Sequence, residues 1–173
     1  MDRIADIVEG IDRWMTRILD ALVIALSGLL FVLLNYAVFT RFVLNSSVSW
    51  SEELPAHILA VLTFIGAAYL TRTSEHLGFD AVVRILSPGL KRAVMAGNLI
   101  LMAGFGALLA WYGGIAAASF GARQLISIDL PMALFRGAMP LGGALITLIC
   151  LVRLAGLLTG RVHPDDLLPE SDA

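Results

Sequence analysis

The histidines and the cysteine are the side chains best suited to bind a metal or a prosthetic group, and their positions limit that chemistry. His57 is the only histidine inside an apolar run, and His76 lies in a polar segment beyond the other end of the same run. A haem in a membrane anchor subunit is usually held by histidines paired across helices, which this placement does not favour. The single cysteine, Cys150, lies in another apolar run, where packing is the expected role. We therefore expect no cofactor, no metal and no catalytic residues.

Carboxylates deep in a membrane are the usual sign of a transporter that works alone. Asp and Glu are absent from all four long apolar segments of this sequence. The deep polar residues are Asn35, Thr63, Asn98 and Thr147. We expect the two asparagines to make hydrogen bonds between helices rather than to contact a ligand. A stand-alone small transporter is therefore disfavoured.

The composition places these residues in a lipid bilayer. Of the 173 residues, 58% are hydrophobic and 15% are charged, and the mean hydropathy is +0.85. A soluble domain carries about 25% charged residues. A net charge of −2 gives no reason to expect a nucleic-acid partner. The sequence predicts an all-α integral membrane protein, a single domain over 1–173, with transmembrane helices at 21–40, 54–71, 93–120 and 131–158.

The two ends of the chain are polar. Residues 1–20 have helical periodicity, with apolar residues including Trp14 on one face and charges on the other. This pattern predicts an amphipathic helix at the membrane interface, or a simple extension of the first transmembrane helix. The tail, 161–173, is acidic and contains proline.

Two apolar runs do not match the thickness of a membrane. The uncharged run 93–122 has thirty residues, which would extend ~45 Å as a helix. Tilt, protrusion or a break near Gly113-Gly114 must absorb the excess. Arg136 and Arg153 enclose only sixteen uncharged residues, so one of the two should lie near hydrocarbon depth.

Basic residues in the short loops predict the orientation. One side would carry Arg3, Arg13, Arg17, Arg72, Arg84, Lys91, Arg92, Arg153 and Arg161. The other side would carry Arg41, Arg123 and Arg136. Because cytoplasmic loops are the richer in Lys and Arg, both termini are expected in the cytoplasm.

Charged residues gather at two membrane edges. The outer group is Arg41, Trp50, Glu52 and Glu53, in which Arg41 could pair with either glutamate and join the first two helices. The inner group is Arg72, Glu75, His76 and Asp80. Each group could serve ordinary anchoring and capping at the membrane edge, or contact with partner subunits.

Small residues recur every four positions in the third apolar segment, at Gly106, Ala110, Gly114 and Ala118. Such a stripe lets another helix approach closely. The neighbour could be a helix of this chain or of another subunit.

The sequence around the two charged groups resembles that of a known family. It runs Val48-Ser49-Trp50-Ser51-Glu52-Glu53-Leu54, then Phe64-Ile65-Gly66-Ala67-Ala68, then Arg72 and Glu75-His76-Leu77-Gly78-Phe79-Asp80. This order is similar to that of the small membrane subunit of tripartite ATP-independent periplasmic (TRAP) transporters, the DctQ-like family. Pro55, Ala56 and His57 differ from the residues common at these positions in that family, as do Leu77 and Phe79.

The resemblance implies a multi-pass protein of the bacterial inner membrane that is not an enzyme. Its partners would be a large multi-helix subunit, which carries the substrate and sodium sites, and a periplasmic substrate-binding protein that delivers an organic acid. The small subunit would brace the large one and widen the docking platform, in contact with membrane lipid. A membrane anchor of a redox complex and a stand-alone transporter are the alternatives.

Overall fold

The computed structural model describes residues 2–73 and 86–160, with side chains from Thr16 onward. The helices are α1 (Asp2–Phe42), α2 (Glu53–Thr73), α4 (Pro88–Phe120), α5 (Ala133–Arg136) and α6 (Ala138–Leu158). Within this part of the chain, four helical stretches are long and apolar enough to cross a membrane: Thr16–Phe42, Glu53–Thr73, Pro88–Phe120 and Ala133–Leu158. The prediction of four long apolar helices is confirmed.

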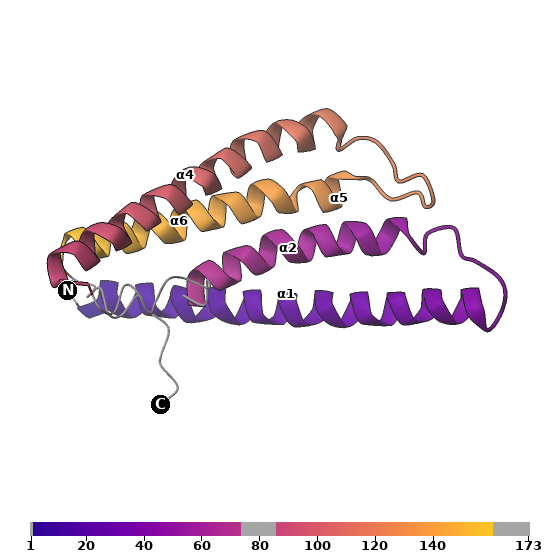
Figure 1. The fold of residues 1–173 in the computed structure, drawn as a ribbon, viewed down its shortest axis with the longest axis horizontal. Coiled ribbons are helices and arrows are strands. Elements are labelled where there is room, and N and C mark those ends of the chain that lie inside the picture. The colour runs from indigo at the N-terminus through magenta and orange to yellow at the C-terminus, as the bar shows by residue number, and fades with distance from the viewer. Residues whose placement is uncertain (1, 74–85, 161–173) are drawn as a thin grey trace.

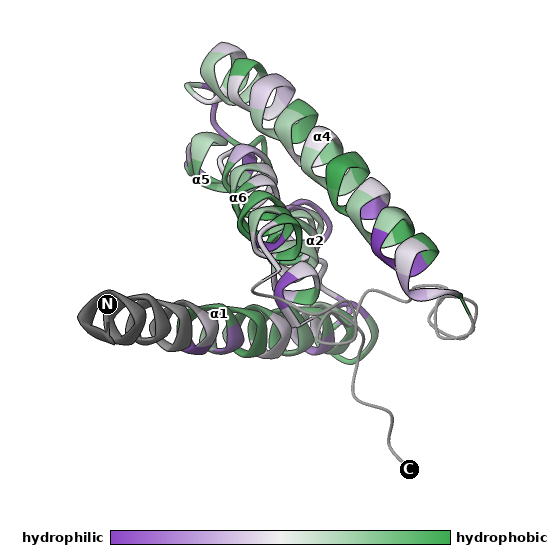
Figure 2. Ribbon diagram, turned by 90° about the vertical axis from the view of Figure 1, so that its left-hand side faces the viewer, coloured by the Kyte–Doolittle hydropathy of each residue, from purple (hydrophilic) through white to green (hydrophobic). Residues whose placement is uncertain are grey.

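The helices lie side by side in the spatial order α1, α2, α6, α4 (Figure 1). α6 packs against α4 on one side and α2 on the other, and α1 packs against α2. α1 and α4 are therefore at opposite edges, and they diverge in the view along the layer (Figure 2). Because the helices form an open layer rather than a closed bundle, much of their apolar surface remains exposed.

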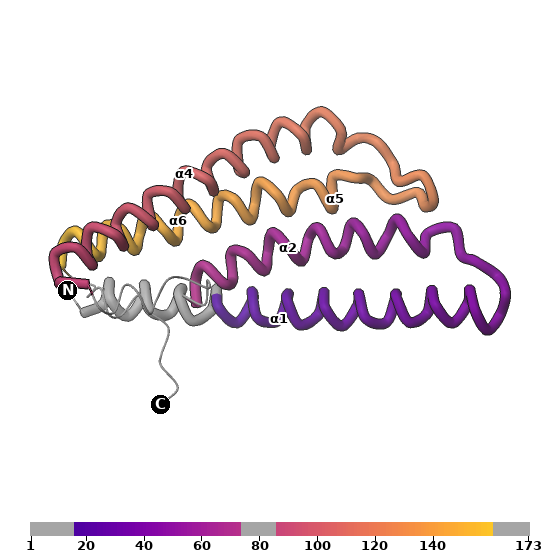
Figure 3. The backbone as a smooth tube through the Cα atoms, in the orientation of Figure 1, coloured from indigo at the N-terminus to yellow at the C-terminus, as the bar shows by residue number. Residues whose placement is uncertain are grey.

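α1 is one uninterrupted helix of 41 residues (Figure 1), and Figure 3 colours its course through the first apolar stretch. At 1.5 Å per residue it is ~60 Å long, about twice the thickness of the hydrocarbon core. Residues 2–20 thus continue directly into the first apolar stretch, as in the extension alternative. After Phe42 the chain reverses through Asn45, whose φ of +50° is a left-handed conformation that asparagine tolerates.

α4 is also continuous, over 33 residues, so the break suggested at Gly113-Gly114 is absent. The helix starts at Pro88, in the first turn, where a missing N–H has little cost. Gly113 is a packing residue and not a hinge, because an added Cβ would lie 2.9 Å from Met139 Cγ and from Pro140 N. Tilt or protrusion must therefore accommodate the length of α4.

The last apolar segment is interrupted near its start. α5 ends at Arg136 and α6 begins at Ala138, with Gly137 between them. Pro140 has no N–H to bond the Arg136 carbonyl, and its ring crowds that oxygen, which accounts for the interruption.

Two adjacent glycines in α6 let both neighbouring helices approach its backbone. A Cβ added at Gly143 would lie 2.6 Å from the Ala110 nitrogen and from the Gly106 oxygen, both in α4. A Cβ added at Gly142 would lie 2.7 Å from the Phe64 oxygen in α2. The buried core follows this central helix and consists of Ala68, Leu99, Ala103, Ile146, Cys150 and Leu157. Cys150 is thus a packing residue, as expected.

The stripe of small residues in α4 does not lie on one face. Gly106 contacts α6 so closely that an added Cβ would be 2.7 Å from Thr147 Oγ1, and Ala110 lies against Gly143. At Gly114, by contrast, an added Cβ meets nothing within 4 Å, and Ala118 is exposed. Four helical residues turn by about 400°, so this spacing drifts by about 40° per step. The stripe therefore turns away from α6 after Ala110.

Arginines secure the end of the layer at which α2 and α6 finish. Arg153 donates through Nη1 to the Thr71 oxygen at 2.8 Å and through Nη2 to the Arg72 oxygen. Arg92 donates through Nη2 to the oxygens of Leu157 and Leu158. The final carbonyls of a helix lack partners within it, and these cations also suit the negative end of the helix dipole.

We predict that Gly106→Leu separates α4 from α6, whereas Gly114→Leu on the same helix leaves the pair intact. Overpacking of a tight contact costs about 1–3 kcal/mol. Thermal unfolding of the two variants in the same detergent measures the difference. Equal melting temperatures for Gly106→Leu and wild type would contradict the contact at Gly106.

Candidate functional site

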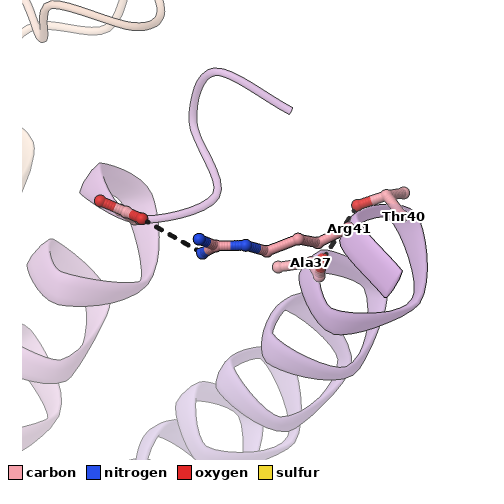
Figure 4. A network of polar contacts seen from close by, with 4 residues as sticks. Ala37, Thr40 and Arg41 are labelled. Atoms are coloured by element: carbon pink, nitrogen blue, oxygen red, sulfur yellow. Dashed lines mark hydrogen bonds and ion pairs between the residues drawn. The ribbon is translucent and has the colours of Figure 1, made fainter. Parts of the chain in front are cut away.

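The loops at one end of the layer contain the outer charged group. We call this the loop end, formed by residues 43–52 and 121–132. Arg41 extends from the last turn of α1 toward α2 (Figure 4), and its Nη1 lies 3.6 Å from Glu52 Oε1. Of the two glutamates considered for Arg41, Glu52 is thus the partner. Both side chains are well exposed, at 63% and 87%, so the pair adds little stability and leaves charge on the surface.

Trp50 attaches the same loop to α1. Its ring stacks on that of Tyr36, with centroids 5.9 Å apart and planes within 7°. Tyr and Trp rings combine an apolar body with one polar group, which suits the interface between membrane and water. The stacking therefore holds the start of α2 near the end of α1.

Glu53 joins the second loop of this end to α2. Its carboxylate accepts hydrogen bonds from the backbone nitrogens of Ile126 at 3.0 Å and Ser127 at 2.8 Å, and from the Ser127 hydroxyl. Charge-assisted bonds of this kind are stronger than neutral ones. Glu52 and Glu53 thus have different partners, since Glu52 faces α1 and Glu53 holds the loop between α4 and α5.

His57 adds a contact between α2 and α5. Its Nδ1 donates to the Glu53 carbonyl at 2.8 Å, and its ring meets Phe135 edge-on, with centroids 5.2 Å apart. The residues that the structure describes contain no group of three or more His, Cys, Asp or Glu side chains able to hold a metal.

Arg123 and Arg136 share one aromatic ring at the loop end. Each guanidinium carbon lies 5.1 Å from the centroid of Phe120, the last residue of α4. Arg123 is in the loop and Arg136 ends α5, so the two approach the ring from different elements. The sequence analysis used the two arginines to predict the orientation, and Arg136 also to predict membrane depth, but it missed this cluster.

The inner group is described only at Arg72, whose Nε donates to Thr16 Oγ1 at 2.7 Å and so joins α2 to α1. Glu75, His76 and Asp80 lie outside the described residues, and their grouping with Arg72 stays a prediction.

The deep polar residues bond mainly to their own helices. Asn35 donates to the Phe31 oxygen at 2.7 Å and Thr63 to the Leu59 oxygen at 2.8 Å, each one turn away. The Asn35 side chain therefore bonds within its own helix, and not to another helix as expected. Thr147 does reach a neighbour, since it donates to the Ala103 oxygen in α4 at 3.3 Å.

Sequence reasoning also missed Gly142-Gly143 and Ser127. Adjacent glycines in an apolar segment could have indicated the first, because small residues mark helix contacts in membranes. No local pattern marks Ser127, which meets Glu53 only through folding.

Comparison with known proteins places these features in a family. Residues 30–160 match the family described as "Tripartite ATP-independent periplasmic transporters, DctQ component". The chain is also 29% identical over 108 residues to the "C4-dicarboxylate TRAP transporter small permease protein DctQ" of Pseudomonas aeruginosa. That alignment covers 60% of this chain and 51% of the relative, so the chain spans about half the length of the curated relative. Because the family match extends over most of the sequence, the chain belongs to the DctQ family of TRAP transporter components, as a small permease component that is a multi-pass inner-membrane protein and not an enzyme.

Proposed function

We propose that this chain scaffolds a large, sodium-coupled membrane subunit and forms part of the platform on which a periplasmic binding protein delivers an organic acid. Membership of a tripartite transporter family supports partners of these two kinds. The relative's name specifies C4-dicarboxylates, and we propose the same class of substrate here.

The observation that carries the proposal is the set of charged contacts that join the two loops of the loop end to α1 and α2. Arg41 and Glu52 join α1 to the start of α2, and Glu53 joins that start to Ser127 in the other loop. The end of α1, the start of α2 and the distant loop at residues 121–132 thus meet at one surface, on which Arg41 and Glu52 remain exposed. A preordered surface loses less entropy on binding than a mobile one, which suits repeated docking of a soluble partner.

The open layer supports the scaffold role. No residue in the most apolar 18-residue stretch of α1 is buried inside the chain. At the other edge, α4 exposes large apolar side chains such as Leu101 and Trp111. Lipid and a large membrane subunit can both cover such faces, and helix association in lipid depends on close packing over long contacts.

We further propose that both termini lie in the cytoplasm. The loop end then faces the periplasm with Arg41, Arg123 and Arg136, and the opposite end carries Arg17, Arg72, Lys91, Arg92 and Arg153. This orientation directs the docking surface toward a soluble periplasmic partner.

The orientation predicts which cysteine variants a membrane-impermeant maleimide labels on intact inner-membrane vesicles of known sidedness. Ile126 is 96% exposed in a loop at the loop end, so Ile126→Cys should react from the periplasmic face alone. Arg17→Cys, at the opposite end, is the matched control and should react from the cytoplasmic face alone. The reverse pattern would refute the proposed topology.

The platform is tested by comparing Glu53→Ala with Glu52→Ala in the reconstituted three-component transporter. Glu53→Ala removes three acceptor contacts and frees the loop at residues 126–127, so we expect a several-fold weaker response of uptake to binding-protein concentration. Glu52→Ala removes only an exposed ion pair and should have a much smaller effect. Equal uptake by both variants and wild type would remove the loop end from the docking surface.

The scaffold role has its own readout in the same preparation. Both variants should co-purify with the large subunit in wild-type amounts, because the contacts they lose lie at the end of the layer. A stable, fully active transporter isolated without this chain would refute the scaffold role.

A further inference from the structure

Arg123 and Arg136 differ from the arginines at the helix ends of this layer. Arg41 pairs with Glu52, and Arg92 and Arg153 donate to helix-terminal carbonyls. The side chains of Arg123 and Arg136 make no hydrogen bond or ion pair with the residues that the structure describes, and Arg136 Nε is buried without an acceptor. A buried donor without a partner typically costs about 1–3 kcal/mol. The cluster is therefore incomplete as it stands.

Phe120 orients the two cations but does not satisfy their N–H groups. A cation over an aromatic face is attracted by the ring quadrupole, at about 0.5–1 kcal/mol for an exposed pair. Both guanidinium carbons lie 5.1 Å from one centroid, so they are at most twice that distance apart. This separation is within about one Debye length at 0.1 M salt, so the two charges repel. An anion held by both would relieve the repulsion and accept the free N–H groups.

The position of the cluster selects the kind of anion. Phe120 ends the apolar stretch of α4, and Arg136 lies in the first turn of the stretch Ala133–Leu158. These are the membrane edges of two spans, where lipid phosphates lie. Exposed apolar side chains lie close by in the sequence, Ile126 three residues after Arg123 and Leu134 two residues before Arg136, and these suit an amphipathic ligand better than a free ion.

A shallow, largely open groove farther along the same helix pair has the apolar lining that an acyl chain requires. It lies between α4 and α6, has a volume of about 470 Å³, and is lined by Ala107, Trp111, Ala144 and Leu148 among others. Leu148, in α6, is twelve residues beyond Arg136 at the end of α5, and twelve helical residues would extend ~18 Å. This is comparable to the ~15 Å thickness of one leaflet.

From these observations we infer that Arg123 and Arg136 bind the phosphate of a membrane phospholipid, and that one acyl chain of this lipid occupies the groove beside Trp111. Bidentate donation from a planar guanidinium matches the geometry of a phosphate. This site shares the loop end and Trp111 with the proposed docking and scaffold surfaces, but its fluorescence test needs neither partner.

Fluorescence of Trp111 tests the site, in the full chain purified in detergent with Trp14→Phe and Trp50→Phe as background. Phosphatidylglycerol with brominated acyl chains should quench Trp111 saturably. Arg123→Gln with Arg136→Gln should raise the half-quenching concentration roughly tenfold or more, since charge-assisted hydrogen bonds are lost. Arg41→Gln, at the same end of the layer, is the matched control and should leave it unchanged. Arg123→Gln alone, at an exposed loop position, should still raise it several-fold if the double variant unfolds.

Two further ligands identify what is recognised. Brominated diacylglycerol has the same chains without phosphate and should bind at least several-fold more weakly. Inorganic phosphate should compete only at far higher concentrations than the lipid. Equal quenching by diacylglycerol, equal affinity of the double variant, or equal competition by inorganic phosphate would overturn the assignment. Loss of the large subunit from the double variant, with unchanged quenching, would overturn it in favour of a protein contact.

Discussion

Close approach of two backbones to α6 is the constraint on which the rest of this structure depends. Gly143 admits α4 and Gly142 admits α2, so that one helix holds two neighbours through consecutive residues. Lipid tails are as apolar as the side chains of these helices. Moving an apolar side chain from lipid to a helix contact therefore contributes little to helix association. Close packing and the dispersion contacts that it permits must supply it instead. The bulk of the buried core accordingly lies along α6 and its contacts with α4 and α2.

Polar groups have a complementary role at the ends of the layer. At the loop end, Glu53 gathers backbone N–H groups from a distant loop, and at the opposite end Arg153 and Arg92 cover helix-terminal carbonyls. Unsatisfied backbone groups are costly near hydrocarbon, so these long side chains complete the hydrogen bonding where helices stop. The apolar middle holds the layer together, and the ends fix its loops.

This division agrees with the place of a DctQ component in a transporter of several parts. A layer one helix thick exposes both faces and both edges to its surroundings, whereas the loops at its loop end are joined to α1 and α2 by the contacts of Glu52 and Glu53. In the proposed function, lipid or a larger subunit covers the faces and a soluble partner meets the loop end. The arginine cluster at Phe120 lies where these two environments join.

The sequence by itself determined the class of protein, the four apolar helices and the family. These follow from composition and from local sequence motifs, such as residues Val48 to Leu54. They need no knowledge of which helices are in contact. Of the two glutamates, neither could be assigned to Arg41 in advance, because the choice depends on how α2 emerges from its loop. Glu75, His76 and Asp80 stay predictions.

Only the tertiary structure decided which small residues matter. Gly106 and Gly114 are alike in sequence and lie on the same helix, yet one touches α6 and the other meets open space. The difference comes from the 100° turn per residue of the helix and from the position of α6. No local sequence pattern gives the position of α6. The same holds for the hydrogen bonds of Ser127 to Glu53 and for the contacts of Arg123 and Arg136 with Phe120. Contacts between distant segments are set by packing geometry and not by spacing in the chain.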